Sequence, residues 1–253
     1  MTIRIHDKFQ KGIEKIFFNG KSTKWSRKIT YIIGNLFLMA FLYAFILLYI
    51  LYNWTGNLYP EGSGYRLDFL GDNLIPFVPE MAILYVYIFY PMVILTLVYF
   101  GLVDEEKGYA LGWAVIIMNL IATVIYILFP VSTYWWRQDL LANKIEGNFF
   151  ADTMYNVYIY DTSFNCFPSM HAGMSTICAY VWYRYYKIKP NLKKKIVAIT
   201  TFIIAIGVIL STLFVKQHYI IDEIAGILLA YIVGRYIFRF FSVWRDIEIP
   251  NQI

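Results

Sequence analysis

Long apolar stretches alternate with short polar ones along this chain, and their pattern predicts its elements. Six apolar runs are long enough, or nearly so, to cross a bilayer as helices, which takes about 20 residues each. These runs lie near 31–52, 81–102, 109–130, 168–187, 196–215 and 217–241. The pattern therefore predicts an all-α, polytopic integral membrane protein in which six transmembrane helices form one bundle.

The overall composition agrees with this reading. Of 253 residues, 59% are hydrophobic and only 15% are charged, which is too apolar for a soluble domain of this size. Without a repeat or a low-complexity run, we expect one membrane domain over 30–245 after a basic segment at 1–29. Two cysteines, Cys166 and Cys178, do not suggest a disulfide framework, because the second falls inside a predicted helix.

The distribution of positive charge predicts how the chain is oriented. With the N-terminus inside, 18 of the 22 Lys and Arg residues fall on the inner side. The four outer ones are Arg66, Arg137, Lys144 and Lys216. By the positive-inside rule both termini are expected in the cytoplasm. The basic residues follow the membrane sides, so we expect no nucleic-acid partner.

Two outer segments connect the predicted helices. The loop over 53–80 is rich in Gly and Pro and carries Asp68 and Asp72, which we expect to be solvated. The segment over 131–167 is the longest outside the membrane and could cover a site. Arg137 follows an aromatic group typical of a membrane interface, and it is also a candidate anion ligand.

A first candidate for chemistry is the stretch that joins the last two apolar runs. His218 and Asp222 are four residues apart, which on a helix places their Cβ atoms about 5–6 Å apart on one face. The carboxylate could accept one imidazole N–H and leave the other nitrogen free to attack or to carry a proton. The alternative is a polar pair that faces water at the start of a helix.

A second candidate opens the fourth apolar run. Pro168 suits the first position of a helix, and Ser169 is a good cap nearby. A helix N-terminus favours phosphate, and His171 in the first turn could donate a proton to a leaving oxygen. The alternative is a helix cap with an incidental histidine.

The predicted topology brings these two stretches together. His171 and His218 lie far apart in sequence, yet both fall at the outer ends of their helices, at the level of Ser169 and Asp222. Such a convergence of polar groups at a membrane interface favours an enzyme site. The sequence has no dedicated metal-ligand cluster, so we expect a reaction without metal or other cofactor.

The same residues resemble the motifs of a known family, the type 2 phosphatidic acid phosphatase superfamily. Its second motif, Pro-Ser-Gly-His, is matched by Pro168-Ser169-Met170-His171. Its third motif is Ser-Arg, five residues, His, three residues and Asp; here Ser211-Thr212, His218 and Asp222 keep that spacing. The resemblance covers about 80–241, is specific in its joint order and spacing, and implies a six-helix bundle.

The resemblance also implies roles for the residues. His218 would attack phosphorus and form a phosphohistidine, Asp222 would orient it, and His171 would protonate the leaving oxygen. Ser169 with its backbone amide would hold phosphate oxygens, and Ser211 belongs to the same substrate-binding group. The membrane domain over 30–245 would then be catalytic.

Two departures from the family pattern bear on the substrate. Thr212 replaces the Arg of the third motif, and the first motif, a Lys followed seven residues later by Arg-Pro, is absent. This looks more like the inositol phosphorylceramide synthase and sphingomyelin synthase branch, whose members move a phosphorylated head group between lipids. Arg137, Lys144 and Lys216 are the candidates to replace the missing cations.

These arguments predict a lipid phosphotransferase or phosphatase at the outer membrane face. Its partners would be a phospholipid or lipid phosphate, with a lipid hydroxyl or water as acceptor. One alternative is a phosphatase for phosphatidic acid or an isoprenoid pyrophosphate. Another is a proton- or ion-coupled transporter, although its charges would be expected near the midplane and in repeated halves.

Overall fold

The computed structural model describes residues 59–60, 62–143, 147–161, 163–188 and 190–241. The basic segment at 1–29, the predicted helix at 31–52 and the candidate Lys144 lie outside the described residues.

Within the described part, the secondary structure is helical, and residues 65, 131 and 165 form isolated bridges but no strand. The helices are α3 (Leu70–Leu74), the 3₁₀ helix η1 (Pro79–Met81), the π-helix η2 (Ile83–Ile88), α4 (Phe89–Val103), α5 (Glu105–Leu128), α6 (Tyr134–Ala142), α7 (Phe149–Tyr160), α8 (Met170–Ile188), α9 (Leu192–Phe214) and α10 (Ile220–Phe240). The predicted all-α class is therefore confirmed.

Three of the described helices are long and apolar enough to cross a membrane. They span Pro79–Val103, Lys107–Leu128 and Leu192–Phe214, close to three of the predicted runs. The runs at 168–187 and 217–241 also form helices, α8 with two charged residues and α10 with four. The chain is consistent with a membrane protein, and six spans stay a prediction.

Polar residues at the helix starts explain where several of these elements begin. Asn191 accepts a hydrogen bond from the backbone of Lys194 at 2.9 Å, and Asn148 accepts one from Ala151 at the same distance. Asp104 does the same for Lys107 at the start of α5. Each side chain satisfies a backbone N–H that has no partner inside the first turn of its helix.

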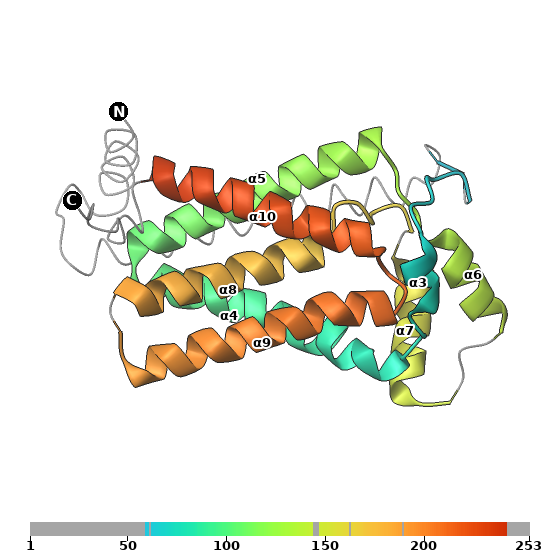
Figure 1. Ribbon diagram of the computed structural model, residues 1–253, viewed down its shortest axis with the longest axis horizontal. Coiled ribbons are helices and arrows are strands. Elements are labelled where there is room, and N and C mark those ends of the chain that lie inside the picture. The colour runs from blue at the N-terminus through green and yellow to red at the C-terminus, as the bar shows by residue number, and fades with distance from the viewer. Residues whose placement is uncertain (1–58, 61, 144–146, 162, 189, 242–253) are drawn as a thin grey trace, which may run out of the picture.

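The long helices form an elongated bundle, with α8 packed against α9, α10, α4 and α5 (Figure 1). Its main core lies between these helices and includes Phe100, Met118, Ile177 and Trp182. Large apolar side chains such as Ile203 on α9 are exposed on the outside of the bundle. This inside-and-outside apolar character is what a lipid environment requires of a spanning helix.

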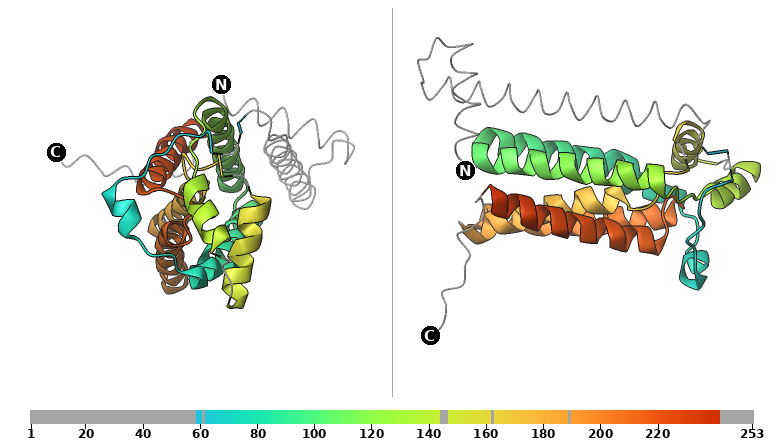
Figure 2. Two further views of the ribbon diagram at one scale, coloured as in Figure 1. Left: turned by 90° about the vertical axis from the view of Figure 1, so that its right-hand side faces the viewer. Right: turned by 90° about the horizontal axis from the view of Figure 1, so that it is seen from above.

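Short helices gather at one end of the bundle. There α3, α6 and α7 surround the turn between α9 and α10 (Figures 1 and 2). The segment expected to cover a site thus lies at the end where the last two helices meet.

One expectation about the outer loop is wrong. Asp72 is not solvated but only 1% exposed. Its Oδ1 accepts the backbone N–H of Ile220 at 2.8 Å, and its Oδ2 accepts that of Phe69 at 3.1 Å. The carboxylate is buried because it satisfies orphan N–H groups at the starts of both α10 and α3.

Candidate active site

The turn between α9 and α10 carries His218, and it is held from several directions. The Tyr158 hydroxyl on α7 donates to the carbonyl of Val215 at 2.5 Å. The Tyr219 hydroxyl donates to the carbonyl of Ser132 at 2.6 Å. Residues 215–219 are all buried, so the imidazole is presented by a fixed turn rather than by a mobile loop.

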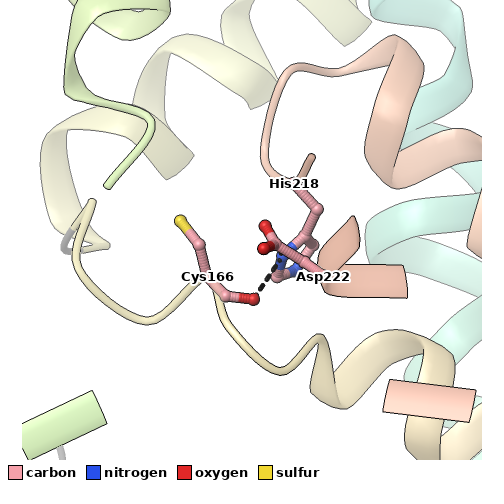
Figure 3. Close-up of side chains that lie close together, drawn as sticks. All are labelled: Cys166, His218 and Asp222. Atoms are coloured by element: carbon pink, nitrogen blue, oxygen red, sulfur yellow. Dashed lines mark hydrogen bonds and ion pairs between the residues drawn. The ribbon is translucent and has the colours of Figure 1, made fainter. Parts of the chain in front are cut away.

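The ring of His218 is oriented by two acceptors at the same nitrogen. Nδ1 lies 2.9 Å from the carbonyl oxygen of Cys166 and 3.5 Å from Oδ2 of Asp222 (Figure 3). A carbonyl can only accept, so Nδ1 carries the proton in this hydrogen bond. In the neutral ring Nε2 then keeps its lone pair, which is the form a nucleophile requires.

Asp222 is itself fixed by the backbone at the start of α10. Its Oδ2 accepts the N–H of Tyr219 at 2.8 Å, and the carboxylate is completely buried. The Asp222 carboxylate therefore faces both the ring and the helix start, and it is placed to stabilise a positively charged imidazole.

The second histidine lies close to the first. His171 is in the first turn of α8, and its ring centroid is 5.6 Å from that of His218 in an edge-to-face arrangement. Tyr85 and Phe89 each lie 4.5 Å from the His171 ring, between centroids. The two aromatic neighbours fix the His171 ring beside the ring of His218.

Ser169 joins the starts of α8 and α10. Its hydroxyl accepts the N–H of Ala172 at 3.2 Å, which makes it the cap of α8. Its backbone N–H, expected to hold phosphate, instead donates to the carbonyl of Asp222 at 2.9 Å. That amide is therefore already engaged and is not available to a ligand.

Helix α10 and the start of α8 approach each other closely, backbone to backbone, next to Ser169. A Cβ atom placed on Gly226 of α10 would lie 2.1 Å from the carbonyl oxygen of Ser169. Only glycine permits this approach without movement of the backbone. The close contact sets the distance between the segment with His171 and the segment with His218.

Arg137 on α6 is the candidate cation that reaches this region. It is 3% exposed, donates from Nη1 to the carbonyl of Asp161 at 2.7 Å, and donates from Nη2 to Oε1 of Gln217. Its Nη2 is also 3.7 Å from Oδ2 of Asp161. The guanidinium thus contacts the residue next to His218, with its charge partly balanced by Asp161.

Two other candidate residues, Lys216 and Ser211, form their contacts away from the histidines. Lys216 donates to the backbone carbonyl of Asp72 at 2.9 Å and lies over the ring of Trp136. Burial lowers the pKa of its ammonium group, partly offset by Asp72. The Ser211 hydroxyl donates to the carbonyl of Val208 at 2.7 Å within its own helix. Neither group contacts the two histidines in the described structure.

Three potential metal ligands meet at this site. The ligand atoms of Cys166, His218 and Asp222 lie within 4.8 Å of one another (Figure 3). However, the sulfur donates to the carbonyl of Ser163 at 3.1 Å and points away from the ring, and Nδ1 already faces a carbonyl. Burial raises the pKa of the Cys166 thiol to about 12, so the sulfur stays a thiol that donates within this network. The set fits a hydrogen-bond network better than a metal centre.

Sequence reasoning missed three contributors to the site. The carbonyl of Cys166 leaves no mark in a sequence, and Asp72 reaches Ile220 across 148 positions. Glu223 did have a signal, because a second acidic residue directly after Asp222 interrupts an apolar run. Its side chain is buried and bonded to Thr212, the residue that stands where the family has Arg.

Comparison with known proteins gives the family. A family model described as the PAP2 superfamily matches residues 76–235, which includes both histidines, Ser169 and Asp222. No curated protein matches the chain, and no solved structure does. Since the matched region covers more than half of the sequence, the chain belongs to the PAP2 superfamily, the type 2 phosphatidic acid phosphatases, and this membership supports a phosphatase-type enzyme.

Proposed function

We propose that this protein transfers a phosphorylated head group from a phospholipid to a lipid hydroxyl, through a covalent intermediate on His218. The observation that carries the proposal is the hydrogen bond from Nδ1 of His218 to the Cys166 carbonyl. It leaves Nε2 unprotonated in the neutral ring, with His171 across from it at a centroid distance of 5.6 Å.

In the first step, Nε2 of His218 attacks phosphorus and the bond from phosphorus to the diacylglycerol oxygen breaks. His171, protonated in the presence of the anionic phosphoryl group, gives its proton to that oxygen, and diacylglycerol leaves as an alcohol. Asp222, 3.5 Å from Nδ1, stabilises the positive charge that develops on the ring.

In the second step, a lipid hydroxyl attacks the same phosphorus and the nitrogen–phosphorus bond breaks. The hydroxyl proton passes to His171, and the lone pair returns to Nε2. Both histidines are then as they were at the start, and water in place of the lipid hydroxyl gives hydrolysis.

The charge of the pocket supports a diester as donor. A phosphate monoester carries close to two negative charges at neutral pH, since its second pKa is about 6, whereas a diester carries one. Lys216 is turned toward Asp72, and the Arg137 charge is shared with Asp161. With few free cations, a singly charged phosphoryl group such as that of phosphatidylinositol suits the site better.

We further propose that the site faces the non-cytoplasmic side, with both termini in the cytoplasm. The support is the asymmetry of Lys and Arg along the chain. The acceptor and donor lipids would then come from the outer leaflet.

The test uses purified protein in detergent with phosphatidylinositol labelled in its inositol ring, with and without ceramide or diacylglycerol. Wild-type protein should acquire acid-labile label and pass it to the acceptor lipid, whereas His218→Ala should acquire none. His171→Ala should form the labelled intermediate slowly, because the leaving oxygen is no longer protonated. Fast hydrolysis of phosphatidic acid, without transfer from the diester, would instead identify a lipid phosphate phosphatase.

A further inference from the structure

Glu223 is a buried carboxyl group to which the mechanism above gives no role. It follows Asp222 in the first turn of α10 and is 3% exposed. Its Oε1 lies 2.8 Å from Oγ1 of Thr212, while Oε2 has no hydrogen-bond partner. Among the residues that the structure describes, no lysine or arginine forms an ion pair with it.

The oxygen–oxygen distances around Thr212 indicate whether this carboxyl group is protonated. Oγ1 of Thr212 lies 2.6 Å from the carbonyl oxygen of Ile209 and 2.8 Å from Oε1 of Glu223. The hydroxyl has one hydrogen, and the carbonyl can only accept. If that hydrogen goes to the nearer carbonyl, the second contact is a hydrogen bond only when Glu223 donates. The geometry thus fits a protonated carboxylic acid.

The burial of Glu223 favours the same protonated state. Its hydrogen-bonding neighbours are Ser169 at the start of α8 and Thr212 on α9, and neither carries a positive charge. On its own helix Asp222 is a neighbouring carboxylate, and His218 is the titratable base beside both. Two adjacent buried carboxylates with one imidazole near them would leave a negative charge unpaired, which is costly.

We propose that Glu223 works as a neutral carboxylic acid beside the position of the phosphoryl group. In this form it provides polar contacts together with Ser169 and Thr212, and adds no negative charge beside His218. When Glu223 ionises, the carboxylate repels the phosphoryl group, and binding of that group in turn favours the protonated acid. Phosphate binding is therefore weakened at alkaline pH.

This inference rests on the proposed function for its effect on catalysis, and the first experiment measures that effect. Glutamine has the shape of the neutral acid, can donate to Thr212, and cannot ionise. In Glu223→Gln, the ratio of transfer rates at about pH 9 and about pH 7 should rise roughly tenfold over wild type, because one ionisation that opposes binding is removed. An unchanged pH profile, or loss of transfer at every pH, would overturn the proposal.

A second measurement is independent of the reaction. Infrared spectroscopy of the purified protein at neutral pH should show the C=O stretch of a protonated carboxylic acid that is absent in Glu223→Gln. Thr212→Val should shift this band to higher frequency, because it removes the hydrogen-bond partner. The band present without any lipid transfer would reject the proposed function but keep Glu223 neutral. Head-group transfer by a protein that lacks the band would reject the neutral state of Glu223 but not the proposed function.

Binding of orthovanadate to the purified protein provides a third readout. Its affinity for wild type should fall as the pH rises, and the fall should be smaller in Glu223→Gln. Equal pH dependence in the two proteins would show that Glu223 does not oppose the anion.

Discussion

The carbonyl oxygen of Cys166 lies 2.9 Å from Nδ1 of His218, closer than the carboxylate of Asp222 at 3.5 Å. Cys166 precedes Phe167-Pro168-Ser169, the segment that leads into the helix with His171. The backbone that positions one histidine therefore also fixes the proton on the other. The two halves of the site are linked by this hydrogen bond and not only by proximity.

The role assigned to Asp222 can be tested with Asp222→Asn. We expect the rate of transfer to fall roughly 10²–10⁴-fold, because the ring keeps its carbonyl partner but loses the charge that stabilises its protonated form. The measurement is kcat for head-group transfer in detergent, together with the amount of labelled intermediate.

Asp72→Asn is the matched control for this change. Asp72 also caps the start of α10, through the N–H of Ile220, but its carboxylate makes no hydrogen bond or ion pair with His218 among the described contacts. Its kcat should stay within about threefold of wild type, since only a cap is weakened. Equal losses in the two variants would mean that Asp222 acts only as a helix cap.

Arg137→Lys should lower kcat/KM by roughly 10- to 100-fold. An ammonium group cannot contact Gln217 and Asp161 together as the planar guanidinium does, and hydrogen bonds to charged groups contribute about 1.5–3 kcal/mol. Initial rates over a range of lipid donor concentrations give this ratio.

Arg66→Lys is the control, because Arg66 is 46% exposed and pairs with Asp68 only two positions away. Such a surface pair contributes about 0–1 kcal/mol, so its rates should hardly change. Wild-type kinetics in Arg137→Lys would remove Arg137 from the site.

Gly226→Ala should destabilise the protein by roughly 1–3 kcal/mol or more and reduce transfer. The added methyl group would lie 2.1 Å from the Ser169 carbonyl oxygen, so the starts of α8 and α10 must separate. Thermal unfolding in detergent measures the first effect.

In Gly207→Ala the new Cβ meets the side chain of Leu84, with Cδ1 at 3.1 Å and Cδ2 at 3.8 Å, and a flexible side chain can move. This variant should unfold close to the wild-type temperature. If Gly226→Ala did the same with full activity, the helices would not depend on that contact.

The Cys166 thiol should not react with maleimide in the folded protein, measured in a Cys178→Ala background. Burial raises its pKa from the ordinary value of 9.0 to about 12. The unfolded thiol ionises from about pH 9, while the folded one stays protonated to about pH 12, so this group favours unfolding as the pH rises through that window. Complete labelling should follow denaturation, and rapid labelling before it would contradict the buried position.

Topology can be tested with single cysteines in a cysteine-free background. Asn143→Cys should react with an impermeant reagent added outside intact cells, whereas Pro190→Cys should react only after permeabilisation. The reverse pattern would place the site in the cytoplasm.

The long helices could be predicted because an apolar run of bilayer length has few alternatives to a helix. The runs at 81–102, 109–130 and 196–215 correspond closely to helices in the structure. By contrast, α6 and α7 were only an outer segment in the sequence. Their short, mixed sequences carry weak helical signals, and tertiary contacts such as that of Tyr158 with Val215 hold them in place.

The site was predictable where it depends on side-chain spacing, as for His218 and Asp222. The site was not predictable where it depends on backbone groups, as for the Cys166 carbonyl and for the Ser169 N–H that donates to the Asp222 carbonyl. The burial of Asp72 follows from a contact between segments 148 positions apart, which local sequence cannot indicate.

The anchoring of the turn at 215–219 limits how far the protein could be shortened. Tyr158 and Ser132, which hold this turn, both belong to the segment between α5 and α8. A minimal version reduced to the long helices would keep both histidines yet lose these supports for His218. Engineering of a smaller catalyst, or exchange of this segment with that of a relative, must therefore preserve both hydroxyl–carbonyl contacts.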